Sequence, residues 1–304
     1  MNSLAEFFIY LFEEKKFSPS AVRGYRSAIT STLRQSSQTD YSNQPLLSEV
    51  IRSFELERPR VAYPVPKWDL ALVLRAISVS PFEPLSDCSL RLLTLKSVFL
   101  LALASGRRRS ELHALSAADN AVSFAADGSS VLLHVFPGFL AKNQLPSVAY
   151  LPMEIPGLQS VEGSDATSVL CPVRALRIYL HRVSDLRRGR RRLFISFLEH
   201  VRNEISASTV SRWIVQTVRT AYELADKSAE HVQVNAHEVR ALANSWSWLN
   251  STPLDQVLRA GYWSVENAFI KFYLRDMSPQ SRALFALGPL VSAQTVIKPP
   301  SSHN

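Results

Sequence analysis

The stretch NAHEVRALANSWSW, residues 235–248, places His237 three positions before Arg240 in an apolar setting. Leu242 and Trp246 are four positions apart, which is helical spacing. Positions i and i+3 share a helix face, so His237 and Arg240 point the same way. Two groups that can carry positive charge are costly side by side in apolar surroundings unless an anion lies between them. The other interpretation is a capped surface helix with a solvated arginine, so residues elsewhere must decide.

The composition describes a globular protein of 304 residues with 46% hydrophobic residues, which suggests about two domains. No apolar run is long enough to span a bilayer, and residues 1–17 lack the basic start and cleavage site of a signal peptide. Cys88 and Cys171 are too few for a disulfide framework or a zinc site. We therefore expect an intracellular protein without metal, cofactor, membrane attachment or small-molecule substrate.

The net charge is +8 and the isoelectric point is about 9.7, which indicates a polyanionic partner. Of the 34 basic residues 8 are lysines, which leaves 26 arginines. Arginine binds phosphate oxygens as a two-pronged fork, so nucleic acid is favoured over an inert arginine-rich surface. The run RRGRRR, residues 187–192, fits a DNA contact, a nuclear import signal or a solvated loop.

The pattern along the chain predicts two domains and a linker. Residues 1–56 read as a small helical domain, residues 57–67 as a proline-rich linker, residues 68–288 as a larger domain and residues 289–304 as a tail. The linker boundary rests on Pro59, Pro64 and Pro66.

The small N-terminal domain carries helix signals and exposed arginines. Ser18 is a natural N-cap, and Pro19 suits the first turn of the helix that follows. We expect Arg23, Arg26 and Arg34 near one exposed side of that helix. The preceding helix is expected to bury an apolar stripe of Leu4, Phe7, Phe8, Leu11 and Phe12.

The larger domain reads as mainly helical with a small hairpin or sheet. Two apolar helices are expected after Trp68, the second over residues 90–105. Strand-like runs follow at residues 131–136 and 148–155. Helical patterns resume over residues 172–181 and 208–224 and continue from the opening stretch to about residue 274.

The segment SGRRRSELHAL, residues 105–115, ends an apolar helix at Gly106 and then presents three arginines. A glycine that lets the chain turn, followed by an inward-facing arginine, suits a phosphate site. Glu111 could hold that arginine in place. The alternative is a basic helix start capped by Ser110.

Lys142 and Tyr273 are two further candidate site residues. Lys142 lies in the expected hairpin turn of an arginine-rich chain, and a lysine can release a proton whereas an arginine effectively cannot. It suggests a general acid, although an ordinary exposed turn lysine is the alternative. Tyr273 follows the anchoring Phe272 on a different helical face, so it projects into a cleft or simply packs.

The order of these residues resembles the motif of the tyrosine recombinase (phage integrase) family. The segments FEEKKFSPSAVRGYRSAI (12–29), VPKWDLALVLRAI (65–77) and FIKFYLRD (269–276) look most like recombinases of DIRS-type retrotransposons. The family motif falls on Arg108, Glu111, Lys142, His237, Arg240, Trp263 and Tyr273.

The resemblance implies a fold and a function. The fold would be mainly α with a small β-sheet or hairpin, arranged as a two-domain DNA clamp with a helical core-binding domain and a catalytic domain. The protein would be a site-specific recombinase, working as a homotetramer on double-stranded DNA in the nucleus to integrate a mobile element. Arg23, Arg26, Arg107 and Arg109 would contact DNA.

The resemblance also implies roles for the motif residues. Arg108 and Arg240 would bind the scissile phosphate, His237 would assist proton loss from Tyr273, and Trp263 would donate its indole N–H. Lys142 would protonate the leaving 5′ oxygen, and Tyr273 would form a 3′-phosphotyrosine.

The chain departs from the family pattern in ways that leave alternatives open. Trp263 stands where histidine is commoner, and Tyr262 is inserted before it, so Tyr262 could fill that place. Arg107 and Arg109 flank Arg108, so register alone selects the binding arginine. A domesticated, non-catalytic DNA-binding protein and a type IB topoisomerase-like enzyme are the alternative functions.

Overall fold

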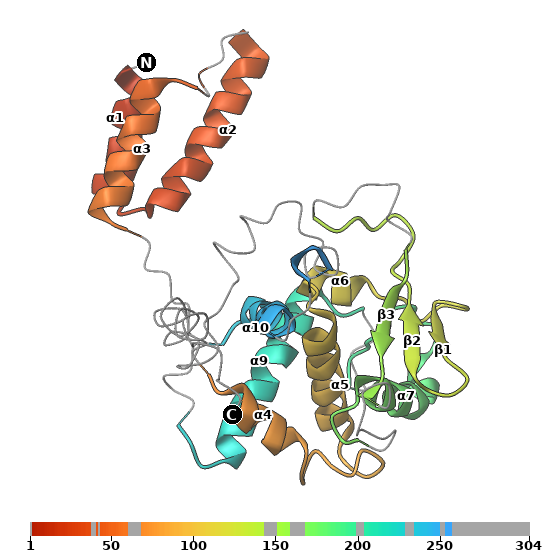
Figure 1. The fold of residues 1–304 in the computed structure, drawn as a ribbon. Coiled ribbons are helices and arrows are strands. Elements are labelled where there is room, and N and C mark those ends of the chain that lie inside the picture. The colour runs from red at the N-terminus through yellow and green to blue at the C-terminus, as the bar shows by residue number, and fades with distance from the viewer. Residues whose placement is uncertain are drawn as a thin grey trace, which may run out of the picture. The chain divides into compact units, whose positions relative to one another are not determined.

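The computed structural model describes residues 2–37, 41, 43–59, 68–142, 151–158, 168–198, 204–228, 234–249 and 253–256 (Figure 1). The chain divides into two compact units, residues 1–63 and residues 64–304. Each unit has its own apolar core.

The described residues of the first unit form three helices: α1 (Asn2–Glu13), α2 (Pro19–Ser37) and α3 (Pro45–Glu57). Phe8 and Phe12 of α1 are fully buried, and the Phe12 ring stacks on Phe54 of α3 with 4.1 Å between ring centroids. Ser18 caps α2 as expected, because its hydroxyl accepts from the Ala21 amide at 3.3 Å. The expected stripe is wrong at Phe7, which is 39% exposed.

The second unit is built around α5 (Leu90–Ser105), in which residues 93–102 are all buried. A helix buried on every side lies at the centre of a domain. Figure 1 shows the sheet on one side of α5, and α9 and α10 on the other. Within the described residues, the helices of this unit are α4 (Leu70–Ile77), α5, α6 (Arg109–Ala114), α7 (Pro172–Arg182), α8 (Ser184–Arg187), α9 (Ala207–Leu224) and α10 (Ala236–Leu249).

The sheet of the second unit has the strand order β1 (Val122–Phe124), β2 (Ser130–Leu133) and β3 (Met153–Pro156), all antiparallel. Val131 lies opposite Ile155, and these two residues are buried on the face toward α5 and α7. The expected hairpin or small sheet is confirmed, because the two expected strands pair with each other as antiparallel β2 and β3, joined by residues 134–152. β1 was not expected, and β2 ends three residues before the expected end of its strand. Residues 148–150 of the second expected strand lie outside the described residues.

The expectation of a mainly helical chain with a small antiparallel sheet is confirmed. The helices expected over residues 90–105, 172–181 and 208–224 are α5, α7 and α9. Within the described residues, no helix is both long and apolar enough to cross a lipid bilayer.

A buried ion cluster ties together the helices around α5. Lys96 is fully buried, and its ammonium donates to the Ile77 carbonyl at 2.6 Å and forms an ion pair with Glu83. Arg174 of α7 donates to both carboxylate oxygens of Glu83, at 3.0 and 3.2 Å. Burial opposes ionisation of Glu83, but hydrogen bonds from Arg174 and Lys96 outweigh it and hold its pKa below the ordinary value.

Candidate functional site

The turn after α5 is shaped by Gly106. This residue has φ +58°, and its amide still donates to Ala102 at 3.1 Å, which closes the last turn of the helix. A left-handed backbone at a helix end favours glycine. A Cβ at this position would also lie 2.9 Å from the side-chain nitrogen of Asn244. Two independent reasons therefore require glycine here.

The arginine that follows is fixed by a buried carboxylate, as expected. Arg108 takes the N-cap position of α6, and its Nη1 lies 3.0 Å from Oε1 of Glu111. Arg107 lies 3.7 Å from the other oxygen of Glu111, which is only 2% exposed. Arg109 begins α6 and is exposed. The alternative of a Ser110 cap is wrong, because Arg108 occupies the cap position.

Arg240 reaches the same turn from the other direction. It lies on α10, is 1% exposed, and donates from Nη1 to the Gly106 carbonyl at 2.8 Å. The alternative interpretation of a solvated surface arginine is therefore wrong. Residues 134 positions apart in sequence meet at this hydrogen bond.

His237 of α10 lies close enough to the arginines of α6 and α10 for their charges to affect its pKa. It is exposed overall, yet the surrounding protein displaces enough water to lower the pKa of its imidazole. The positive charges of Arg109, Arg240 and Arg108 lower that pKa further. α6 and α10 therefore bring three guanidinium groups within electrostatic range of one imidazole. This arginine cluster (Arg108, Arg109, Arg240 and His237) is suited to an anion, because an anion would relieve the repulsion.

The other expected site residues are Lys142, Trp263, Tyr262 and Tyr273, of which the structure describes only Lys142. Lys142 is exposed in the connection between β2 and β3, and within the described residues it forms no hydrogen bond or ion pair. Trp263, Tyr262 and Tyr273 lie outside the described residues.

Some arginines of the run at residues 187–192 bind backbone carbonyls of the protein itself, which the sequence did not reveal. Arg187 donates to the carbonyls of Arg192 and Leu193, the latter at 3.0 Å, and burial lowers its pKa. Arg192 donates to the His113 carbonyl at 3.1 Å, and its guanidinium carbon lies 4.5 Å from the centroid of the Phe136 ring. The run is therefore partly an internal brace that holds this loop against the end of α6.

The first unit presents its own basic groove on α2. This α2 groove has a volume of about 390 Å³. Arg23 forms an ion pair with Glu55, and Arg26 donates to the Ser48 hydroxyl at 3.0 Å, so α3 orients both side chains. The groove is lined by Arg23, Arg26, Ser27, Thr30, Ser31 and Arg34.

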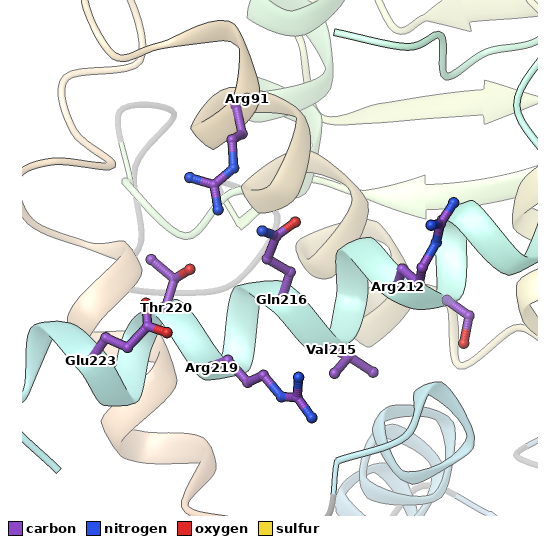
Figure 2. A pocket seen from close by; sticks show the side chains of 8 residues that line it. Arg91, Arg212, Val215, Gln216, Arg219, Thr220 and Glu223 are labelled. Carbon is purple, nitrogen blue, oxygen red and sulfur yellow. The ribbon is translucent and has the colours of Figure 1, made fainter. Parts of the chain in front are cut away.

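A second basic groove lies along α9 and was not expected from the sequence (Figure 2). This α9 groove has a volume of about 460 Å³. In Figure 2, Arg91 of α5 points toward Gln216 and Thr220 of α9. Arg91 and Arg219 form no hydrogen bond or ion pair within the described residues, so they can take an external anion. The lining is completed by Ser211, Arg212, Val215 and Glu223.

The sequence predicts the residues that α9 contributes to the α9 groove, but not the residue that α5 contributes. Arg212, Gln216, Arg219 and Glu223 recur every three or four residues, which predicts one polar face of a helix. Arg91 joins them only through the packing of α5 against α9, which no local pattern reveals.

The described residues contain no group of three histidine, cysteine or acidic side chains that could hold a metal ion. Cys88 and Cys171 are buried free thiols.

Comparisons with known proteins indicate the fold. No protein-family model matches the chain, and no curated protein matches it significantly. Two solved structures of a lambda integrase dimer bound to a COC′ core site are similar, with TM-scores of 0.51 and 0.50 and sequence identities of 15% and 16%. A lambda integrase tetramer bound to a Holliday junction has a TM-score of 0.50 at 14% identity.

These similarities extend over most of the chain. They cover 91%, 90% and 90% of this protein, in the same order. The protein spans 80% of the first of those chains but only 64% of each of the other two. At this identity the likeness establishes a shared fold, so the chain has a fold similar to that of lambda integrase.

Proposed function

We propose that this protein is a site-specific DNA recombinase of the tyrosine recombinase type. The observation that carries the proposal is the convergence of Arg108 from α6 and Arg240 from α10 beside His237. The fold shared with DNA-bound lambda integrase supports it. The further resemblance to recombinases of DIRS-type retrotransposons leads us to propose integration of a mobile element in the nucleus.

Arg108 and Arg240 would bind the non-bridging oxygens of one DNA phosphate. A guanidinium presents paired N–H donors that match two phosphate oxygens. Glu111 keeps Arg108 in place, and the Gly106 carbonyl keeps Arg240 in place. Both donors are therefore preorganised for the charge that grows during phosphoryl transfer, which is the main source of stabilisation in such sites.

Proton transfer would complete the reaction. Tyr273 would attack phosphorus and pass its proton to His237, whose lowered pKa keeps the imidazole neutral and able to accept it. The P–O5′ bond would break as the Tyr273–phosphorus bond forms, and Lys142 would protonate the departing 5′ oxygen. A 5′ hydroxyl from another strand would reverse these steps, so no nucleotide triphosphate is consumed. Trp263, or Tyr262 in its place, would donate to the phosphate.

The basic grooves would hold the rest of the DNA. Arg23 and Arg26 of the α2 groove and Arg107 and Arg109 near the site would contact the phosphate backbone. The α9 groove adds Arg91, which points into it. Backbone contacts release counterions, so binding should weaken steeply with salt. The two units would close on the duplex as a clamp, and four copies would assemble on two duplexes.

The test is strand transfer on duplexes that carry a nick near the cleaved bond. The nick lets the short 5′-hydroxyl strand leave, so a covalent protein–DNA adduct accumulates. A pool of duplexes of varied sequence supplies the unknown target. The wild-type protein should form a detergent-resistant adduct and release its DNA when an excess of a complementary 5′-hydroxyl strand is added. Tyr273→Phe should bind the same pool and form no adduct. Equal adduct yields from both proteins would refute the assignment of Tyr273.

A further inference from the structure

Asn244 lies one helical turn beyond Arg240 on α10 and is 5% exposed. Its side-chain nitrogen donates to the Arg240 carbonyl at 2.7 Å and to the Gly106 carbonyl at 3.4 Å. An amide NH₂ has two hydrogens, so one nitrogen can serve both acceptors. Asn244 therefore links the backbone that carries Arg240 to the turn that precedes Arg108.

The contact between Asn244 and Gly106 leaves no room for a side chain at position 106. An added Cβ at Gly106 would lie 2.9 Å from Nδ2, 3.2 Å from Oδ1 and 3.3 Å from Cγ of Asn244. The Gly106 carbonyl also accepts from Arg240 at 2.8 Å. One carbonyl thus receives donors from two consecutive turns of α10, which fixes the position of that helix along the turn and its rotation about its own axis.

We propose that Asn244 is a positioning residue that fixes α10 to the Gly106 turn, so that Arg240 and Arg108 face the same phosphate. The proposal rests on the proposed function for its catalytic consequence. Its structural part, the placement of Arg240 relative to Arg108, Arg109 and His237, can be measured without DNA. An error of about 1 Å in such a placement is enough to slow a reaction by about 100-fold.

The first experiment compares adduct formation on the nicked duplexes by wild-type protein, Asn244→Leu and Ser247→Ala. Leucine keeps a similar volume and removes the donor. Ser247 is the matched control, because its hydroxyl donates to the Ala243 carbonyl at 3.0 Å on the same helix and its removal leaves Gly106 untouched. We expect Asn244→Leu to form adduct about 10- to 100-fold more slowly with unchanged DNA affinity, and Ser247→Ala to match the wild type. Equal rates for all three proteins would overturn the proposal.

The second experiment measures the pKa of His237 by NMR in the protein without DNA. Burial lowers this pKa most, and among the described residues the positive charges of Arg109, Arg240 and Arg108 lower it further. If Asn244 holds Arg240 near the other two, Asn244→Leu lets Arg240 move away, and the pKa of His237 rises. Ser247→Ala should leave it unchanged. A slower reaction of Asn244→Leu with an unchanged His237 pKa would overturn the positioning role.

The third experiment uses Gly106→Ala alone and with Asn244→Ala. The single Gly106 variant is strained both by its φ of +58° and by the clash with Asn244. Truncating Asn244 removes the clash but also the two hydrogen bonds of its amide, so Asn244→Ala alone is measured as the reference. Gly106→Ala should lower the melting temperature less in the Asn244→Ala background than in the wild type. Equal losses in the two backgrounds would show that the two residues do not press against each other, and the proposal would fail.

These readouts separate the two proposals. If the wild-type protein forms no adduct with any duplex that it binds, the proposed function fails. The His237 pKa and the melting temperatures still decide whether Asn244 positions Arg240.

Discussion

Arg108 is the residue whose chemistry bears most directly on the proposed reaction. Arg108→Lys keeps a positive charge near Glu111 but removes the fork that fits two phosphate oxygens. We expect the rate of adduct formation to fall about 100-fold, the loss typical when one preorganised donor is removed. Single-turnover rates on the nicked duplexes provide the measurement. Arg109→Lys is the matched control, and a larger loss for that variant would move the phosphate-binding role to Arg109.

His237 should make the stability of the protein depend on pH. Its folded-state pKa lies below the ordinary 6.5, so between that lowered value and 6.5 the unfolded chain binds more protons than the folded one. The stability contributed by a neutral His237 is therefore present above pH 6.5 and is lost as the pH falls through this window. His237→Gln should melt with a weaker dependence on pH from pH 7 to pH 5. Identical slopes for both proteins would contradict the lowered pKa.

For single residues of the candidate site, the sequence predicted local features but not the contacts between distant segments. The spacing of His237 and Arg240 and the break at Gly106 were visible, and so was the Glu111 partner of Arg108. The hydrogen bond from Arg240 to Gly106 and the amide link of Asn244 were not. Both join segments far apart in the chain, and a single asparagine inside an apolar helical pattern carries no local signal.

The helices around α5 depend on the buried cluster of Lys96, Glu83 and Arg174. Glu83→Gln removes the carboxylate that compensates a fully buried ammonium. Breaking a buried pair by removing one partner costs about 3–5 kcal/mol. The free energy of unfolding measured in urea should fall by roughly that amount.

The control for this ion cluster removes both charges of the closest pair. Glu83→Gln combined with Lys96→Met should recover part of the loss, because no uncompensated ammonium remains. A double variant less stable than Glu83→Gln alone would show that Lys96 contributes by packing or by its bond to Ile77 rather than by its charge.

The longer helices were predictable because their apolar pattern repeats over several turns. α5, α7 and α9 lie within a residue or so of their expected bounds. Strands were less predictable, since β1 and β2 have only three and four residues and their pairing is not local. The arginine run shows a further limit. Its charge pattern indicated a surface feature, whereas Arg187 and Arg192 bond to backbone carbonyls.

The net charge of +8 has a consequence for the whole molecule. If the α2 groove contacts the phosphate backbone, the affinity for duplex DNA should fall steeply with salt. Arg34→Gln should weaken binding uniformly across sequences and reduce the slope of log K against log salt by about 1. Binding isotherms at several salt concentrations measure the slope. Arg75→Gln, an exposed arginine on α4, is the control, and equal slopes for both variants would remove the α2 groove from the interface.

The two units could be anticipated because three prolines separate two stretches with their own apolar patterns. The proposed clamp and the proposed tetramer could not be anticipated in this way, because such contacts would depend on DNA and on other copies of the chain. The fold similarity to lambda integrase covers most of the chain. The proposed reaction rests on Tyr273, whose role an isolated covalent intermediate would reveal.

The most direct measurement of the central claim is to identify the amino acid that carries DNA in the trapped adduct. The adduct would be digested with nuclease and protease, and the modified peptide sequenced by mass spectrometry. We predict a nucleotide joined through its 3′ phosphate to Tyr273. A nucleotide on Tyr262, or no adduct from protein that binds the duplexes, would contradict the account.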